Sequence, residues 1–187
     1  MLGAGGPAGP VSSAAGDEGD PPPSRVLIAY ATRYGSTAEV AQAIAKTLRE
    51  RGVTPDVRDV HEAADLQGHD AVVFGAPFYF ARMLGAGRRF LARQRRALAE
   101  MPVAVFVLGL QPEDKRQRRL ERMLTRPPAI RPLSVGLFGA VVDGSKLRFC
   151  RKAPPIRKLL PEGVDTRDWK AIEEWARALP GRLGTKP

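Results

Sequence analysis

Five stretches of the chain are rich in apolar residues and too short to form helices. The runs at 26–30, 70–75 and 103–109 are almost continuously apolar, which is typical of strands buried on both faces of a sheet. Segments 57–60 and 133–142 are expected to form two more strands. The pattern therefore predicts a sheet of five strands.

Between these strands the apolar residues recur at helical spacing. Val40, Ala41, Ile44, Ala45 and Leu48 lie on one stripe of a helix that Gly52 ends. Further helices are expected at 84–99, 113–124 and 168–179, the last with Trp169, Ile172, Trp175, Ala176 and Leu179 on its apolar face. Strands that alternate with helices predict an α/β fold, in which helices cover both faces of a parallel sheet.

Two strand orders remain open for such a sheet, the doubly wound order 2-1-3-4-5 and the Rossmann order. Both orders place ligands at the carboxyl ends of the strands, beside the point where the strand order reverses. In this chain those ends are residues 31–37, 76–83 and 109–114. We therefore look for function in these three loops.

Length and composition indicate one domain with a tail at each end. The chain has 187 residues, of which 43% are hydrophobic, enough for one core. Residues 1–24 are mostly Gly, Ala, Pro and Ser and are expected to be disordered. The folded domain should span 25–180, followed by a short tail, 181–187. Neither a secretory signal nor a run of about 18 apolar residues is apparent, so we expect a cytoplasmic protein.

The positive charge is concentrated in two segments. The net charge is +10; residues 82–126 carry twelve basic and four acidic side chains, and 145–161 carry six basic and no acidic ones. This favours an anionic partner. Nucleic acid is the weaker choice because no helix-turn-helix, ribonucleoprotein motif or zinc spacing is present. We expect His61 and His69 to lie at the surface or at a strand edge, and Cys150 to be an incidental thiol.

The first loop has the chemistry of a phosphate site. Thr32, Tyr34, Gly35, Ser36 and Thr37 supply hydroxyls and a permissive glycine where a strand enters a helix, and unpaired backbone N–H groups at such a helix start bind phosphate. The simpler alternative is that Ser36 or Thr37 caps the helix. The chain has no GxxxxGK[ST], no GxGxxG after the first strand, and no acidic pair at its end. A monophosphate ligand fits best.

The residues of this loop also carry a family resemblance. The run 28–44 resembles the flavodoxin signature, although Ala29 stands where a larger apolar residue is usual. Residues 74–79 resemble the second flavin loop of that family. Segments 138–140 and 161–176 are similar to the menaquinone-dependent protoporphyrinogen oxidase branch of flavodoxin-domain proteins. The resemblance covers about residues 25–180 and implies a flavodoxin-like α/β fold, a five-stranded parallel sheet of order 2-1-3-4-5.

The resemblance implies that FMN is the cofactor. Its phosphate would lie in the first loop and its ring between the second and third loops, against the aromatic run 78–80, from which we choose Tyr79 as the stacking residue. For Phe78 and Phe80, ordinary packing is an equal alternative. The residues expected to bind FMN are Thr32, Arg33, Tyr34, Gly35, Ser36, Thr37, Ala76, Pro77, Phe78, Tyr79, Phe80, Ala81, Gly109, Leu110 and Gln111.

The resemblance further implies a flavoenzyme that passes electrons from a porphyrinogen to a quinone. Arg82, Arg88, Arg148 and Arg151 are candidates to bind porphyrin carboxylates, and the basic and apolar segment 146–160 suits peripheral contact with an anionic membrane. This connection is shorter than in the oxidase branch. Because Ala81 replaces a flexible glycine of the branch, we expect the flavin to cycle by two electrons.

Two other functions remain open from the sequence. One is a small FMN electron carrier with an unusual basic docking face, and the other is a flavodoxin fold without FMN that serves as a binding module. We expect no catalytic acid or base and no metal site in any of the three, because a flavin needs from the protein mainly placement and electrostatics.

Overall fold

A computed structural model of the chain describes residues 23–63, 65–79, 82–110, 113–126, 129–142 and 163–184. Its elements follow one another in the order β1 (Arg25–Tyr30), α1 (Ser36–Glu50), β2 (Thr54–Asp59), β3 (Ala71–Tyr79), β4 (Arg82–Met83), α2 (Gly85–Arg93), α3 (Arg95–Ala99), β5 (Val103–Leu108), α4 (Glu113–Leu124), β6 (Ser134–Phe138), β7 (Val141–Val142), β8 (Val164–Asp165) and α7 (Trp169–Leu183). Strands and helices thus alternate along most of the chain.

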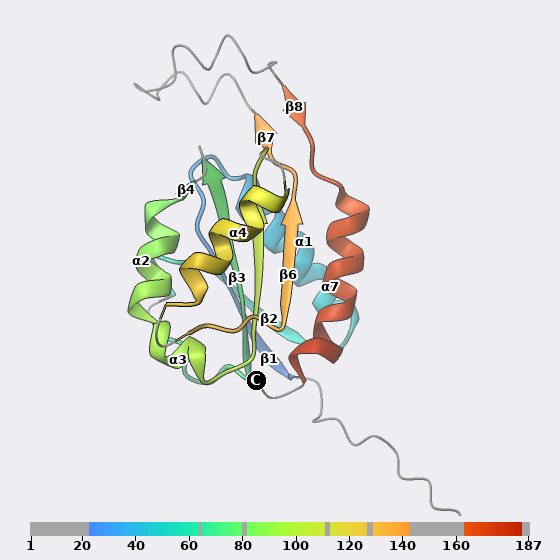
Figure 1. The fold of residues 1–187 in the computed structure, drawn as a ribbon. Helices are drawn as coiled ribbons and strands as arrows, with labels where there is room; N and C mark the ends of the chain where they lie inside the picture. Colours follow the sequence, from blue (N-terminus) through green and yellow to red (C-terminus); the bar gives the residue numbers. More distant parts are fainter. Residues whose placement is uncertain are drawn as a thin grey trace, which may run out of the picture.

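The main sheet has the predicted order. Strands β2, β1, β3, β5 and β6 lie side by side and are all parallel. This is the order 2-1-3-4-5, with the reversal between β1 and β3, so that the Rossmann order is excluded. Two strands were not expected, β4 and β8: β4 folds back on β3 as a short antiparallel addition, and β8 pairs with β7. A separate pair, β7 and β8, extends beyond the end of the main sheet (Figure 1).

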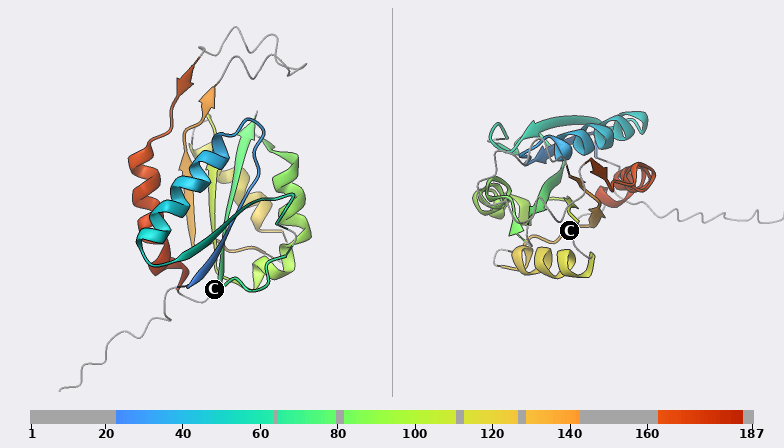
Figure 2. Two further views of the ribbon diagram at one scale, coloured as in Figure 1. Left: turned by 180° about the vertical axis from the view of Figure 1, so that it is seen from behind. Right: turned by 90° about the horizontal axis from the view of Figure 1, so that it is seen from above.

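Helices cover both faces of the sheet. Helices α1 and α7 lie on one face, and α2, α3 and α4 lie on the other (Figure 2). Each face buries its own apolar core: the first includes Ile44, Leu48 and Ile172, and the second includes Phe90, Leu91 and Leu120. Burial of apolar side chains on both faces explains why the central strands read as continuous apolar runs.

Two of the predicted elements are divided in the structure. The helix expected over 84–99 is interrupted at Gln94, and Arg95 then turns toward α4 and donates to the carbonyl oxygen of Met123. The strand expected over 133–142 divides at Gly139, where the chain approaches the backbone of Thr166 too closely for any side chain. In both places a tertiary contact, which local sequence cannot encode, ends the element.

The last helix continues past the expected end at residue 179. It includes Pro180 and ends at Leu183. Proline costs a helix one hydrogen bond, but Leu179 and Leu183 are both buried against the sheet, and their burial offsets that loss. The helical residues 181–183 therefore belong to the packed part of the chain, in the segment that the sequence suggested as a tail.

The amino-terminal boundary is marked by a polar contact. Asp70, just before β3, accepts hydrogen bonds from the N–H and the hydroxyl of Ser24 and from the N–H of Arg25. These bonds lower the pKa of the Asp70 carboxyl, the largest effect being that of Arg25 N–H. The segment that we expected to be disordered is described only from residue 23 onward.

The two histidines lie at opposite ends of the strands: His61 follows the carboxyl end of β2, and His69 precedes the amino end of β3. His61 is exposed, whereas the side chain of His69 is 6% exposed, and its Nε2 lies 3.2 Å from a carboxylate oxygen of Asp56 on the edge strand β2. Cys150 and the basic segment 145–161 lie outside the described residues. Within the part of the chain that the structure describes, no helix is long and apolar enough to cross a bilayer. In the same part, no group of His, Cys, Asp and Glu is arranged to hold a metal ion.

Candidate functional site

The loop between β1 and α1 presents an open helix start. Gly35 is the residue that precedes the helix, and its φ of +93° is in the left-handed region that glycine favours. Its N–H donates to the hydroxyl oxygen of Thr32, at 3.0 Å. No side chain caps the helix, so the alternative in which Ser36 or Thr37 serves as a cap does not apply. The N–H groups of the first helical turn therefore remain available to a ligand.

Thr37 adds a hydroxyl without a partner at the same place. Its side chain is fully buried, and among the residues that the structure describes no group forms a hydrogen bond with its Oγ1. An unpaired buried hydroxyl costs roughly 1–3 kcal/mol. Together, the free amides, the positive end of the α1 dipole and the Thr37 hydroxyl fit an oxyanion such as a phosphate.

The second loop begins later than the sequence suggested. Strand β3 continues to Tyr79, so Ala76, Pro77 and Phe78 are strand residues rather than loop residues. Phe78 is buried in the core under α2 and pairs with Met83 across the β3–β4 hairpin, which agrees with the packing alternative for this residue. Phe80 and Ala81 at the tip of the hairpin lie outside the described residues.

Tyr79 connects the first two loops. Its ring centroid lies 6.1 Å from that of Tyr34, and the two rings meet edge to face at 80°. Tyr79 is largely buried, and this burial raises its pKa to about 12. The guanidinium of Arg33 lies 5.5 Å from the Tyr34 ring centroid. The structure thus brings an aromatic pair from two distant segments to the edge where the open helix start lies.

The third loop follows β5 at the same edge. The N–H of Gly109 donates to the carbonyl oxygen of Phe138, at 3.2 Å, and Leu110 is 46% exposed. Gln111 lies outside the described residues. The carboxyl ends of β1, β3 and β5 are adjacent because the strands are neighbours in the sheet, so the three segments that the sequence singled out do meet.

A buried arginine supports the third loop, and sequence reasoning missed it. Arg116 on α4 is 4% exposed, donates to the carbonyl oxygen of Phe138, and packs against Gly109. Burial lowers the pKa of its guanidinium. The spacing of Arg116, Leu120 and Leu124, which share the buried stripe of α4, was the signal that could have distinguished it from the solvated arginines of that helix.

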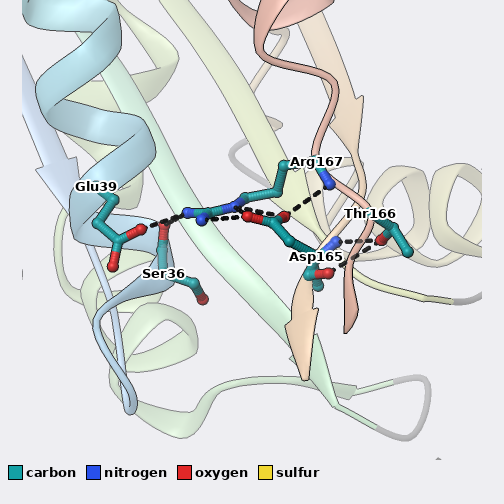
Figure 3. Close-up of polar contacts among 6 residues, drawn as sticks. Ser36, Glu39, Asp165, Thr166 and Arg167 are labelled. Carbon is teal, nitrogen blue, oxygen red and sulfur yellow. Dashed lines mark hydrogen bonds and ion pairs between the residues drawn. The ribbon is translucent and has the colours of Figure 1, made fainter. Parts of the chain in front are cut away.

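A second missed residue, Arg167, fastens the chain after β8 to the start of α1 (Figure 3). It donates to a carboxylate oxygen of Glu39, at 2.7 Å, and to the carbonyl oxygen of Ser36, at 3.4 Å. It also forms hydrogen bonds with both carboxylate oxygens of Asp165. Its guanidinium lies 4.4 Å from the Trp169 ring centroid. These contacts fix the position of the first turn of α1 relative to the chain after β8.

The neighbouring residue Thr166 fastens the same segment to the end of β6. Its hydroxyl accepts from the N–H of Ala140, at 3.0 Å, and its own N–H donates to the Ala140 carbonyl oxygen, at 3.1 Å. Residues 138–140 and the described part of the second segment, 163–176, are therefore in contact, as a pair that the sequence set apart, and Arg167 in the second segment borders the open start of α1.

Comparison with known proteins agrees with this architecture. A family model described as a flavodoxin domain matches residues 27–155. The chain is 31% identical over 178 residues to protoporphyrinogen IX dehydrogenase [quinone] of Escherichia coli (strain K12), covering 87% of this chain and 98% of that protein. It is 32% identical over 82 residues to an NAD(P)H dehydrogenase (quinone) of Acidovorax ebreus, covering 32% of this chain and 41% of that one.

The fold has a close counterpart among solved structures. The oxidised Flavodoxin 2 of Bacillus cereus superposes with a TM-score of 0.59 at 18% identity, covering 84% of this chain and 99% of that one. At this identity the likeness concerns the fold alone. The family match and the E. coli relative, taken with the strand order and the open helix start, show that the chain belongs to the flavodoxin domain family.

Proposed function

We propose that this protein binds FMN and passes electrons from a porphyrinogen to a quinone. The observation that supports it most directly is the start of α1, where a helix without a side-chain cap adjoins the buried, unpartnered hydroxyl of Thr37. The phosphate of FMN would bind there, held by that hydroxyl, by the hydroxyl of Ser36 and by the backbone amides. The E. coli relative, named for porphyrinogen and quinone, supports the substrates.

The aromatic edge of the site would receive the flavin ring. The ring centroids of Tyr79, the last residue of β3, and Tyr34, in the first loop, lie 6.1 Å apart, and Gly109 and Leu110 lie at the end of the neighbouring strand β5. FMN supplies the redox chemistry, whereas the chain supplies binding, orientation and the surrounding charge. In each turnover the porphyrinogen would lose a pair of electrons and protons, and a quinone would become the quinol.

The first experiment measures FMN binding. Fluorescence quenching of FMN on titration with the purified protein gives the dissociation constant for the wild type and for the double variant Thr32→Ala/Thr37→Ala. We expect the double variant to bind at least about tenfold more weakly, because it loses hydrogen bonds to a charged group. Unchanged affinity in this variant would contradict the assignment of the loop.

The second experiment measures the reaction. The FMN-loaded protein is mixed without oxygen with protoporphyrinogen IX and menadione, and the rise of porphyrin fluorescence is followed. We expect oxidation to require both the protein and the quinone. A rate no greater than that of free FMN with the same quinone would reject the porphyrinogen activity and leave FMN binding to be judged separately.

A second candidate function is electron transfer by a small FMN carrier. Membership of the flavodoxin domain family supports it, and the basic residues of α2 and α4 would form its docking face. One-electron reduction that is visible by electron paramagnetic resonance during a reductive titration would favour the carrier. Two-electron reduction with quinone-dependent turnover would favour the enzyme.

We also propose that the protein is cytoplasmic and meets the inner face of the membrane peripherally, where a quinone is available. Its excess of basic residues supports this, because each Lys or Arg near an anionic surface contributes about 1 kcal/mol. Co-sedimentation with vesicles that contain phosphatidylglycerol, and its loss at high salt, is the expected result. Binding only to neutral vesicles, or to none, would contradict it.

A further inference from the structure

A groove lies between α2 and α4, on the face of the sheet opposite α1. The two helices stand next to each other there (Figure 1, Figure 2), and the space between their side chains has a volume of about 580 Å³. This size falls within the range of roughly 300–1,000 Å³ that small-molecule sites occupy. The groove does not coincide with the open start of α1.

The two walls of the groove carry arginines. Arg82, Arg88 and Arg89 lie on the wall formed by β4 and α2, and Arg119, Arg122 and Arg126 lie on the wall formed by α4 and the residues after it. None of these six arginines forms an ion pair with a carboxylate of the residues described. By contrast, Arg118, on α4 but not in the groove, is paired with Asp114. Unpaired cations on opposing walls attract an anion placed between them.

The floor of the groove is apolar. Met83 and Leu91 line it and are almost fully buried, and Met123, partly buried, lines it from α4. Arg95 connects the two walls, because it donates to the carbonyl oxygens of Met123 and Leu124 at the end of α4. A ligand that fits must therefore combine an apolar body with several negative groups.

One end of the groove adjoins the candidate flavin site. Arg82 pairs with Tyr79 across the β3–β4 hairpin, and Tyr79 is the residue that we expect beside the flavin ring. A molecule bound along the groove would therefore have its nearer end next to the second loop. A flat bilayer would not enter a concave site of this kind, whereas a small molecule would.

We propose that this groove binds an amphipathic polycarboxylate, with its apolar body on the methionine and leucine floor and its carboxylates between the arginines of the two walls. Guanidinium groups bind carboxylates through two parallel hydrogen bonds, which gives orientation as well as affinity. The inference rests on the proposed function and deepens it, since it places the carboxylates of a tetrapyrrole substrate on Arg88 and Arg119, with Arg82 at the end near the flavin.

The test uses the FMN-loaded full chain and two probes. Mesoporphyrin IX carries two carboxylates, and its dimethyl ester has the same body without their charge. Binding is measured by quenching of porphyrin fluorescence for the wild type, for Arg88→Gln/Arg119→Gln, and for the control Arg49→Gln/Arg131→Gln. The control removes the same charge from exposed arginines outside the groove.

We expect the groove variant to bind the dicarboxylate at least about tenfold more weakly than the wild type, and the control to stay within about twofold. The ester should bind weakly to all three proteins. Equal losses in the groove variant and the control, or equal binding of acid and ester by the wild type, would overturn the inference. Thermal melts of the three proteins verify that each is folded.

Separate measurements distinguish the inference from the proposed function. If the groove variant oxidises protoporphyrinogen with an unchanged KM, the groove is not the substrate site even though the proposed function holds. If the wild type binds mesoporphyrin through the groove but oxidises no porphyrinogen, the proposed function fails and the groove assignment stands. If the groove variant loses binding to phosphatidylglycerol vesicles while it retains mesoporphyrin, the arginines serve a membrane and the inference is overturned.

Discussion

Arg167 and Glu39 are 128 positions apart in the sequence, yet a guanidinium nitrogen of Arg167 lies 2.7 Å from a carboxylate oxygen of Glu39. The same guanidinium also binds Asp165 and the carbonyl oxygen of Ser36. One planar group with several donors thus ties the chain after β8 to the first turn of α1 (Figure 3). That turn is the proposed phosphate site, so this arginine positions the site without lining it.

Replacement of Arg167 by Met should destabilise the protein by about 1 kcal/mol. Hydrogen bonds to charged groups contribute roughly 1.5–3 kcal/mol, but the exposure of the Glu39 and Asp165 carboxylates reduces their contribution. Urea unfolding monitored by circular dichroism measures the change. Arg177→Met is the control: it breaks an exposed pair with Glu173 on α7 and should cost no more than about 0.5 kcal/mol. Equal losses of unfolding free energy in the two variants would show that the Arg167 contacts stabilise the protein no more than an exposed ion pair does.

Thr37→Val should have opposite effects on stability and on FMN binding. The Thr37 hydroxyl is buried and unpartnered within the described part of the chain, so its removal should leave the FMN-free protein as stable or more stable, by up to about 1 kcal/mol. Binding of FMN should weaken by about tenfold. Thermal melts with and without FMN, together with fluorescence titration, measure both effects. A Val variant that is less stable without FMN and binds it normally would mean that the hydroxyl has only a structural role.

Gly35→Ala should cost both stability and FMN affinity. Gly35 has a φ of +93°, and a residue with a Cβ in this region is strained by roughly 1–3 kcal/mol. Gly52→Ala is a matched control at the other end of α1, because Gly52 has a φ of +78° and an added Cβ there would meet no atom within 4 Å. We expect similar losses of stability in urea but an FMN affinity that falls only in Gly35→Ala. A loss of affinity in both variants would indicate general loosening of α1.

Gly75→Ala should destabilise the protein strongly. A Cβ at this position in β3 would lie 2.0 Å from the ring of Phe106 on the neighbouring strand β5. Overpacking of a closed core costs about 1–3 kcal/mol or more. The double variant Gly75→Ala/Phe106→Leu provides the space and should be more stable than the sum of the two single changes predicts, as measured by a double-mutant cycle. If the two changes in unfolding free energy simply added, the Phe106 ring would not be what excludes a side chain at position 75.

The pH dependence of stability at alkaline pH should depend on Tyr79. Burial raises its pKa to about 12, above the ordinary value of about 10, so the folded protein holds this proton more tightly than the unfolded chain does. The stability that the neutral Tyr79 hydroxyl contributes to the folded protein is fully present below pH about 10 and is lost as the pH rises toward 12. The free energy of unfolding of Tyr79→Phe should therefore fall less steeply over this interval. Parallel curves for the two proteins would contradict the burial of the hydroxyl.

Local pattern predicted much of the architecture. Continuous apolar runs identified β1, β3 and β5, because a strand covered on both faces has no polar positions. The flavodoxin-like resemblance of residues 28–44 selected the strand order, and the loop from Thr32 to Thr37 was correctly placed at the carboxyl edge of the sheet. These strands and this loop are formed by residues that are close together in the sequence, so the sequence alone was enough to predict them.

Only the tertiary structure decided the rest. The burial of Arg116, the contact of Arg167 with Glu39, the close approach of Gly139 to Thr166 and the groove between α2 and α4 all join segments that are far apart in the chain. The helical spacing of Arg116 is a sequence signal of its burial, but nothing in the residues around Arg167 indicates that its guanidinium meets carboxylates rather than water. The sequence by itself determined most of the strands and helices and which loops meet at the carboxyl edge of the sheet; the packing of distant segments determined which arginines are buried in structural contacts and which line the groove.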